Sequence, residues 1–292
     1  METVMPCYSP AKAFKCADGS IVFSQLKRHG DIVGDIKVPC GQCIGCRIDR
    51  AQQWAIRCLH EAKVWQENCF VTLTYTDSDL PADGGLCYRD FQLFMKRLRK
   101  ELGPLRFFMC GEYGEQTFRP HYHAILFGID FPDKVYRGKS ATGYPVYESE
   151  LLEKCWQKGR CEIGSVSKES AGYVARYCMK KVTGDLAELR YGNKEPEFCR
   201  MSLKPGIGSE FFFKYQGDIL PNDYIVMDGF KAPVPKYYDK LYVKNGGDLE
   251  EVQYQRELCA MQFRDNQTPE RLAVRREVTE RKLKMLNRGK VE

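Results

Sequence analysis

The middle of the chain alternates stretches typical of strands with stretches typical of amphipathic helices, and this order is the feature that most restricts the fold. Short runs of β-branched and aromatic residues between turn residues predict strands, whereas apolar residues recurring every three or four positions predict helices. The helix expected over 88–103 ends where Gly103 and Pro104 follow. The expected elements are strands over 69–76, 105–112, 120–128 and 160–166, and helices over 88–103, 148–158 and 167–182.

These elements follow one another as β-α-β-β-α-β and a final helix, which is the split βαβ or ferredoxin-like pattern. The expected fold class is therefore α+β with an antiparallel sheet. In this topology the strand at 120–128 lies near the centre of the sheet, and the strand at 105–112 lies beside it in a hairpin. A loop is expected from Asp133 to Tyr147, where Gly, Ser and Pro are frequent.

The central strand carries two of the four histidines of the chain, His121 and His123, one residue apart. Side chains at i and i+2 of a strand project from the same face, so both imidazoles point to one place. Glu112 ends the hairpin partner, and its carboxylate is expected to approach the two rings. Two nitrogens and one oxygen suit Mg²⁺ or Mn²⁺ in a site that also accepts a phosphate oxygen. The simpler alternatives are core histidines satisfied by their neighbours and a charge at a hairpin end.

The final helix carries a pair of tyrosines in "YVARYCMKK", residues 173–181. Tyr173 and Tyr177 are spaced i and i+4 and lie away from the apolar stripe of the helix, and Lys180 and Lys181 extend that side by one turn. A phenolate could attack a phosphodiester there while a lysine and the metal stabilise the developing charge. The alternative is that the two phenols pack against a second surface, such as the C-terminal tail.

The N-terminal segment contains "CGQCIGC", with two consecutive C-x-x-C spacings at Cys40, Cys43 and Cys46. Zn²⁺ favours four thiolates, so a structural zinc site is predicted with Cys7 as the fourth ligand. Cys16 could replace Cys7. An iron–sulfur cluster and reduced thiols without a ligand are the alternatives.

Composition restricts the class of protein and its compartment. The 292 residues are 43% apolar and 12% aromatic, as in a globular protein, and 45 basic against 39 acidic residues give a net charge of only +6. No apolar run approaches the roughly 20 residues that span a bilayer, and the first residues lack the apolar core of a signal peptide. A cytoplasmic protein without a membrane partner is expected. Its 14 cysteines are then reduced thiols or metal ligands.

Three ordered motifs, "FVTLTY", "RPHYHAILFG" and "YVARYCMKK", resemble those of the HUH-type rolling-circle replication initiators. The tyrosines separated by three residues resemble the subgroup of isometric single-stranded DNA phages. "PCGQCIGCRIDRAQQWAIRCLHE" and "CGEYGE" look closer still to the replication initiation proteins of gokushoviruses, which belong to the Microviridae. The resemblance covers roughly residues 1–185. Tyr122 stands where that family usually has a bulky apolar residue, but it faces the other side of the sheet.

The resemblance implies roles for the residues already noted: the metal ligands are His121, His123 and Glu112, the nucleophiles are Tyr173 and Tyr177, and the accompanying lysine is Lys180 or Lys181. It also implies the reaction. A tyrosine nicks the viral origin DNA, presented as a single strand or a melted duplex, and keeps the 5′ phosphate as a phosphotyrosine ester. The released 3′ hydroxyl is extended by a host polymerase. Because no "GxxxxGK[ST]" motif is found, unwinding requires a host helicase. The location implied is the cytoplasm of the bacterial host.

Three segments are expected: a Cys-rich, irregular segment at 1–48, the nicking and joining domain at 49–204, and a tail at 205–292. The tail has a loop-rich first half and ends in a basic helix, which could contact phosphates or be solvated. Two other functions compete. One is an RRM-like protein that binds single-stranded nucleic acid without catalysis. The other is a metal hydrolase of small phosphate esters, which leaves the two-tyrosine helix unexplained.

Overall fold

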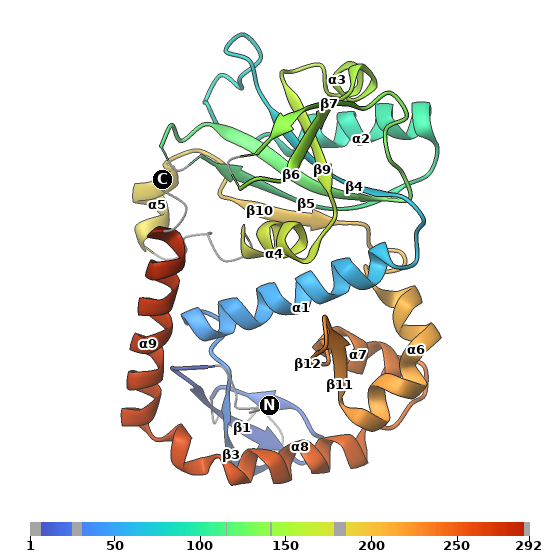
Figure 1. The fold of residues 1–292 in the computed structure, drawn as a ribbon. Helices are drawn as coiled ribbons and strands as arrows, with labels where there is room; N and C mark the ends of the chain where they lie inside the picture. The colour runs from blue at the N-terminus through green and yellow to red at the C-terminus, as the bar shows by residue number, and fades with distance from the viewer. Residues whose placement is uncertain (1–6, 25–30, 115, 141, 178–184, 289–292) are drawn as a thin grey trace. The chain divides into compact units, whose positions relative to one another are not determined.

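The computed structural model describes residues 7–24, 31–114, 116–140, 142–177 and 185–288. It confirms an α+β chain with antiparallel sheets and a Cys-rich N-terminal segment (Figure 1). Two compact units are present, residues 50–248 and the combination of residues 1–49 with residues 249–292. Contacts therefore group residues 205–248 with residues 50–204, whereas the functional boundaries at 48/49 and 204/205 remain a prediction.

A seven-stranded sheet organises residues 50–248, with the strand order β10-β5-β6-β4-β9-β8-β7. The strands expected from the sequence occupy adjacent places as β5-β6-β4-β9, and each of these neighbouring pairs is antiparallel. The histidine strand β6 therefore has a partner on each side, as expected. The seven strands are β4 (Asn68–Thr74), β5 (Arg106–Tyr113), β6 (Pro120–Phe127), β7 (Val135–Lys139), β8 (Pro145–Glu148), β9 (Cys161–Ser165) and β10 (Phe198–Met201).

Helices cover both faces of this sheet (Figure 1). One face packs against α2 (Tyr88–Leu102) and α3 (Glu150–Trp156), with Phe91, Phe94 and Trp156 fully buried. The other packs against residues of α1 (Ile44–Ala62) and α4 (Lys168–Tyr177), and we call it the α1/α4 face. Helix α2 ends as predicted at Gly103, which adopts φ 83° and donates its N–H to Arg99 O.

The loop expected from Asp133 to Tyr147 is wrong, because these residues form the hairpin β7–β8 at the edge of the sheet. A turn closes the hairpin: Ser140 N donates to Tyr144 O at 2.8 Å, and Gly143 N donates to Ser140 O at 2.9 Å. The turn-forming residues were read correctly, but the two strands are short. No residue of β7 is buried, so the segment lacks the apolar alternation that signals a strand.

The N-terminal segment is not irregular as predicted, because it forms a three-stranded antiparallel sheet in the order β2-β1-β3. Residues 249–292 belong to the same unit and are helical where described. Tyr8 joins the two parts, since its phenol oxygen lies 2.8 Å from Thr279 Oγ1. The elements are β1 (Ala11–Cys16), β2 (Ile21–Val22), β3 (Ile32–Val38), α8 (Glu250–Gln262), η1 (Arg264–Gln267) and α9 (Pro269–Arg288).

The remaining elements follow α4 along the chain and give regular structure to residues predicted to be loop-rich. They are α5 (Asp185–Tyr191), α6 (Ser209–Asn222), the hairpin β11 (Tyr224–Met227) with β12 (Phe230–Pro233), and α7 (Lys236–Lys244). Among the helices of the described residues, none is long and apolar enough to cross a membrane.

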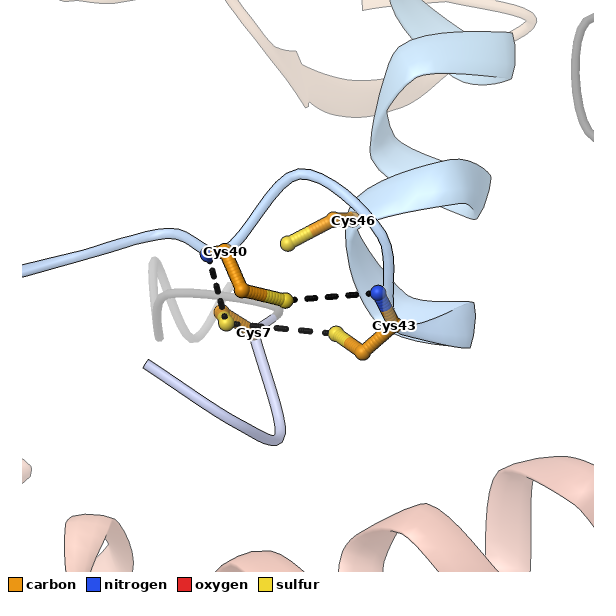
Figure 2. A group of neighbouring side chains, drawn as sticks. All are labelled: Cys7, Cys40, Cys43 and Cys46. Carbon is orange, nitrogen blue, oxygen red and sulfur yellow. Dashed lines mark hydrogen bonds between the residues drawn. The ribbon is translucent and has the colours of Figure 1, made fainter. Parts of the chain in front are cut away.

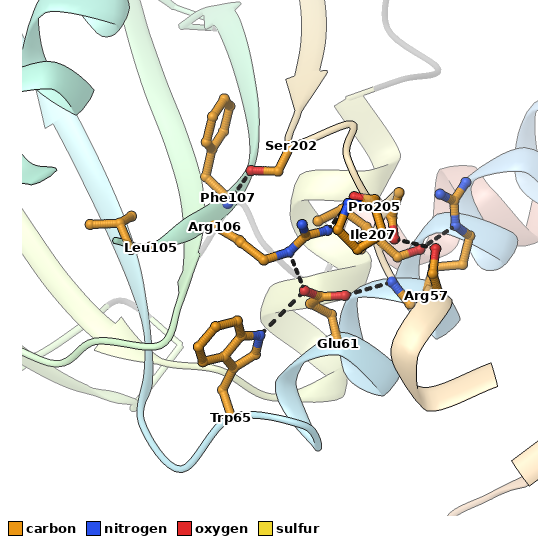
Figure 3. A network of polar contacts seen from close by, with 12 residues as sticks. Arg57, Glu61, Trp65, Leu105, Arg106, Phe107, Ser202, Pro205 and Ile207 are labelled. Atoms are coloured by element: carbon orange, nitrogen blue, oxygen red, sulfur yellow. Dashed lines mark hydrogen bonds and ion pairs between the residues drawn. The ribbon is translucent and has the colours of Figure 1, made fainter. Parts of the chain in front are cut away.

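A buried polar network attaches α1 to β5, the strand that carries Glu112 (Figure 3). Glu61 Oε1 accepts hydrogen bonds from Arg106 Nε at 2.5 Å and from Trp65 Nε1 at 3.3 Å, while Gly208 N donates to Glu61 Oε2 at 2.7 Å. The side chains of Glu61 and Arg106 are only 5% and 15% exposed. Removing one member of a buried ion pair leaves the other charge uncompensated, so this network stabilises the fold around β5.

We expect Glu61→Ala to lower the free energy of unfolding by about 3 kcal/mol or more, because the Arg106 guanidinium loses its buried counter-charge. Urea denaturation followed by circular dichroism measures the change. Lys154→Ala is the control, since Lys154 pairs with Glu101 at 3.8 Å with its own side chain 68% exposed, and such a pair contributes about 0.2 to 1 kcal/mol. Equal losses in the two variants would contradict a stabilising role for the buried pair.

Candidate active site

The β5–β6 hairpin brings Glu112 and the two histidines together. The register pairs Glu112 with His121 and Cys110 with His123, so all four side chains lie on the α1/α4 face. Glu112 Oε1 lies 2.7 Å from His121 Nε2 and 3.2 Å from His123 Nε2. One carboxylate oxygen thus faces both imidazoles, in the arrangement that the sequence predicted.

Burial and charge make Glu112 a strong acceptor. Its side chain is 3% exposed, and those of His121 and His123 are 18% and 7% exposed. Burial raises the pKa of the Glu112 carboxyl, but hydrogen bonds and positive charge from the two histidines outweigh this effect and lower the pKa to about 2. The carboxylate is therefore ionised at neutral pH, the form in which it can bind a cation.

The three donor atoms fit a divalent metal ion. One carboxylate oxygen and two imidazole nitrogens lie within 4.8 Å of one another. Three protein ligands on one side leave coordination positions for water and a phosphate oxygen, whereas a closed structural site would need a fourth protein ligand. The donor set is thus consistent with the predicted Mg²⁺ or Mn²⁺ site, and the identity of the ion stays a prediction.

Tyr173 lies beside this group. Its helix α4 begins after Ser167, whose side-chain oxygen accepts a hydrogen bond from Ser170 N at 3.2 Å, as expected of an N-cap. The ring of Tyr173 meets the ring of His123 edge-on, with centroids 5.1 Å apart and planes at 86°. One predicted nucleophile therefore contacts one predicted metal ligand.

The other predicted members of the tyrosine helix cannot be placed in the same way. Tyr177 is the last residue of α4, and its side chain lies outside the described part of the chain. Lys180 and Lys181 also lie outside the described residues. Their roles stay predictions.

Two residues of β4 complete the surroundings of His123 and were not named as site residues from the sequence. Phe70 stacks on His123 with ring centroids 5.6 Å apart, and Thr72 Oγ1 lies 3.0 Å from His123 Nδ1. The signal that could have found them is the predicted strand order. A strand next to the histidine strand places alternate residues of 69–76 on the histidine face.

The second predicted site gathers four cysteines in the N-terminal unit (Figure 2). The Sγ atoms of Cys7, Cys40, Cys43 and Cys46 lie within 4.8 Å of one another. Cys40 N donates to Cys7 Sγ and Cys43 N donates to Cys40 Sγ, each at 3.3 Å. Cys16, the alternative fourth ligand, lies in β1 and is not part of this group.

Backbone amides around the cluster favour thiolates. Burial raises the pKa of Cys43, but hydrogen bonds from the backbone of Cys46 and Tyr8 and from neighbouring thiols outweigh this effect and lower the pKa to about 6. Burial raises the pKa of Cys46. A metal ion binds the thiolate form, so it would compete with the protons of this group. Four sulfur donors in one cluster fit a structural Zn²⁺ site.

We expect the purified chain to contain about one zinc ion per molecule, because four thiolates are a preferred donor set for Zn²⁺. Plasma mass spectrometry measures metal content, and Cys40→Ser or Cys43→Ser should reduce zinc to near zero. Cys16→Ala is the matched control and should retain the metal. Iron in place of zinc would favour a cluster, and a chain with neither metal would rule out the site.

Comparisons with known proteins agree on one group. A family model of the replication-associated protein ORF2 matches residues 68–182. The "Replication-associated protein VP4" of Bdellovibrio phage phiMH2K is 37% identical over 255 residues, which cover 82% of this chain and 78% of that protein. The "Replication-associated protein ORF2" of Spiroplasma virus 4 is 31% identical over 261 residues, covering 81% and 80% of the two chains. The "Replication-associated protein ORF4" of Chlamydia phage 1 is 30% identical over 218 residues, covering 71% and 54%. No solved structure matches the chain.

Proposed function

The chain belongs to the family of replication-associated proteins of small bacteriophages, and we propose that it starts rolling-circle replication by cutting and rejoining phage origin DNA. Its relatives carry replication-associated names, and the matched family model spans β4 through α4. The proposal makes the chain a metal-dependent, site-specific DNA endonuclease and strand transferase of the HUH type. The HUH form of the ferredoxin-like fold is part of this proposal, and the strand order β5-β6-β4-β9 supports it.

One observation carries the proposal. The ring of Tyr173 lies 5.1 Å from the ring of His123, and His123 shares the carboxylate oxygen of Glu112 with His121. A nucleophile next to a three-ligand cation site is the combination that phosphodiester cleavage requires. An RRM-like binding sheet has no need of it, because such a sheet binds bases through aromatic side chains.

The chain's own residues have distinct tasks in the proposed reaction. Glu112, His121 and His123 would hold a divalent ion, which supplies charge stabilisation to the scissile phosphate when bound. The phenol oxygen of a tyrosine attacks the phosphorus and gives its proton to solvent. A phosphotyrosine ester forms with the 5′ phosphate, and the bond from phosphorus to the 3′ oxygen breaks. That oxygen takes up a proton and leaves as a 3′ hydroxyl, while Lys180 or Lys181 stabilises the developing charge.

Reversal of the same step accounts for joining. The ester retains the energy of the broken phosphodiester bond, so a 3′ hydroxyl can attack it and reseal the strand without ATP. The partners proposed are single-stranded or melted origin DNA, a host helicase that unwinds the duplex and a host polymerase that extends the 3′ end. The compartment proposed is the cytoplasm of the bacterial host.

The experiment that tests the function is formation of a covalent adduct. The purified chain is incubated with Mn²⁺ and a single-stranded oligonucleotide that carries the phage origin, and the products are separated on a denaturing gel. We expect a protein–DNA band that requires the metal and disappears with EDTA. DNA binding without an adduct would favour the RRM-like alternative. Hydrolysis of small phosphate esters without an adduct would favour the hydrolase.

A further inference from the structure

Thr72 stands directly opposite His123 in the sheet and contacts its ring. The register of β4 and β6 pairs the two residues, and Thr72 Oγ1 lies 3.0 Å from His123 Nδ1. At the other end of the ring, His123 Nε2 lies 3.2 Å from Glu112 Oε1. The imidazole is thus held at both nitrogens by side chains from the two strands that flank β6.

We infer that Thr72 positions His123 as a metal ligand by holding the ring proton on Nδ1. An imidazole that binds a cation through Nε2 must carry its remaining proton on Nδ1, and the group facing Nδ1 fixes this tautomer and the direction of the ring. The hydroxyl oxygen of Thr72 can accept that proton in a hydrogen bond. The inference rests on the proposed function, and Thr72 is a positioning residue because it acts through His123.

The same ring is positioned against the nucleophile. Phe70 projects from the same face of β4 as Thr72 and stacks on His123 with an angle of 15° between the planes. Tyr173 contacts the ring of His123 at 5.1 Å and that of Phe70 at 6.3 Å, in both cases edge to face. Rotation of the imidazole would therefore change two things at once, the direction of Nε2 and the packing of Tyr173. Thr72 opposes that rotation through its hydrogen bond to Nδ1.

The second histidine is oriented by different means. His121 Nδ1 lies 3.1 Å from the backbone oxygen of Arg119, a contact that no side-chain substitution removes. Thr74 lies opposite His121 in the register and on the same face as Thr72, yet its hydroxyl donates to Arg160 O at 2.8 Å. Thr74→Val therefore removes a hydroxyl two residues away on the same strand without removing a recorded histidine contact. It is the matched control.

The test measures binding of Mn²⁺ to the full chain without DNA, from the electron paramagnetic resonance signal of the free ion. We expect Thr72→Val to weaken Mn²⁺ binding by about 10- to 100-fold, the typical effect of removing a hydrogen-bond partner of a ligating histidine. Thr72→Ser keeps the hydroxyl and should restore most of the affinity, whereas Thr74→Val should bind as the natural chain does. Thr72→Ala serves if valine disturbs the sheet, and thermal unfolding midpoints show which variants keep the fold.

Nitrogen NMR of the histidine rings gives a readout that a purely structural role would not change. In the metal-free chain, Thr72→Val should lower the fraction of His123 with its proton on Nδ1, and Thr74→Val should leave it unchanged. Unaltered Mn²⁺ affinity in a folded Thr72→Val chain, with His123→Ala abolishing binding, would overturn the positioning role and leave the proposed metal site intact. If the natural chain and His123→Ala bind Mn²⁺ equally, both proposals are wrong.

Discussion

Replacing both His121 and His123 with alanine is expected to reduce formation of the covalent DNA adduct by about 1,000-fold or more. The double variant removes two of the three groups within reach of a shared cation, and loss of a catalytic metal removes several kcal/mol of transition-state stabilisation. Affinity for the oligonucleotide should change much less, because it is spread over many basic side chains. Gel analysis of the adduct and fluorescence anisotropy of a labelled oligonucleotide measure the two quantities separately. Glu112→Ala should weaken use of the metal and shift the preference among divalent ions.

His60 provides the matched control for this experiment. It is also a buried histidine, 2% exposed, but its Nδ1 lies 2.9 Å from the Tyr238 hydroxyl and it has no place in the Glu112 cluster. His60→Gln should therefore lower stability while the folded fraction still forms the adduct. Undiminished nicking by the double histidine variant, or by the natural chain in EDTA, would be incompatible with the proposed metal site.

Tyr173→Phe and Tyr177→Phe are each expected to retain some cleavage of a short oligonucleotide, whereas the double variant should form no adduct. After one round the enzyme is still esterified and must cut the regenerated origin to release a unit-length strand. A second phenol about 6 Å further along the helix axis can attack that junction while the first ester is held. Each single variant should consequently fail to sustain repeated production of circles, which a circular origin template measures over many rounds.

Tyr136→Phe is the control for loss of a phenol, since Tyr136 lies on the edge strand β7 and is 56% exposed. It should behave as the natural chain does in both assays. If either tyrosine variant of α4 supported many rounds at the full rate, that tyrosine would be structural and the mechanism with two nucleophiles would have to be abandoned.

The core of the fold and the histidine cluster could be predicted because their signals are local. Residues 69–128 show strand and helix periodicities separated by turn residues, and a short hairpin fixes which residues face each other. Glu112 was placed near His121 on this basis, and the register pairs them. The resemblance to replication proteins of the Microviridae rested on motifs in the same region, and relatives from small phages confirm it.

Other features could not be predicted because they depend on neighbours distant in sequence. The strands β7 and β8 gain their place from pairing at a sheet edge, and their side chains carry no buried face to announce it. The contact of Thr72 with His123 depends on the strand order and the register, across 51 positions of sequence. Tyr8 meets Thr279 across 271 positions, a separation that no local pattern records.

This last contact has a consequence for biosynthesis. Residues 1–49 share a compact unit with residues 249–292, and residues 50–248 are inserted between them. At about 5 to 20 residues per second, the ribosome needs roughly 15 to 50 seconds to advance from Tyr8 to Thr279. The unit that begins first is therefore completed last, after the strands that carry the histidines have been synthesised. Until then the four-cysteine cluster, whose members all emerge within the first 46 residues, is the part of that unit that can already assemble.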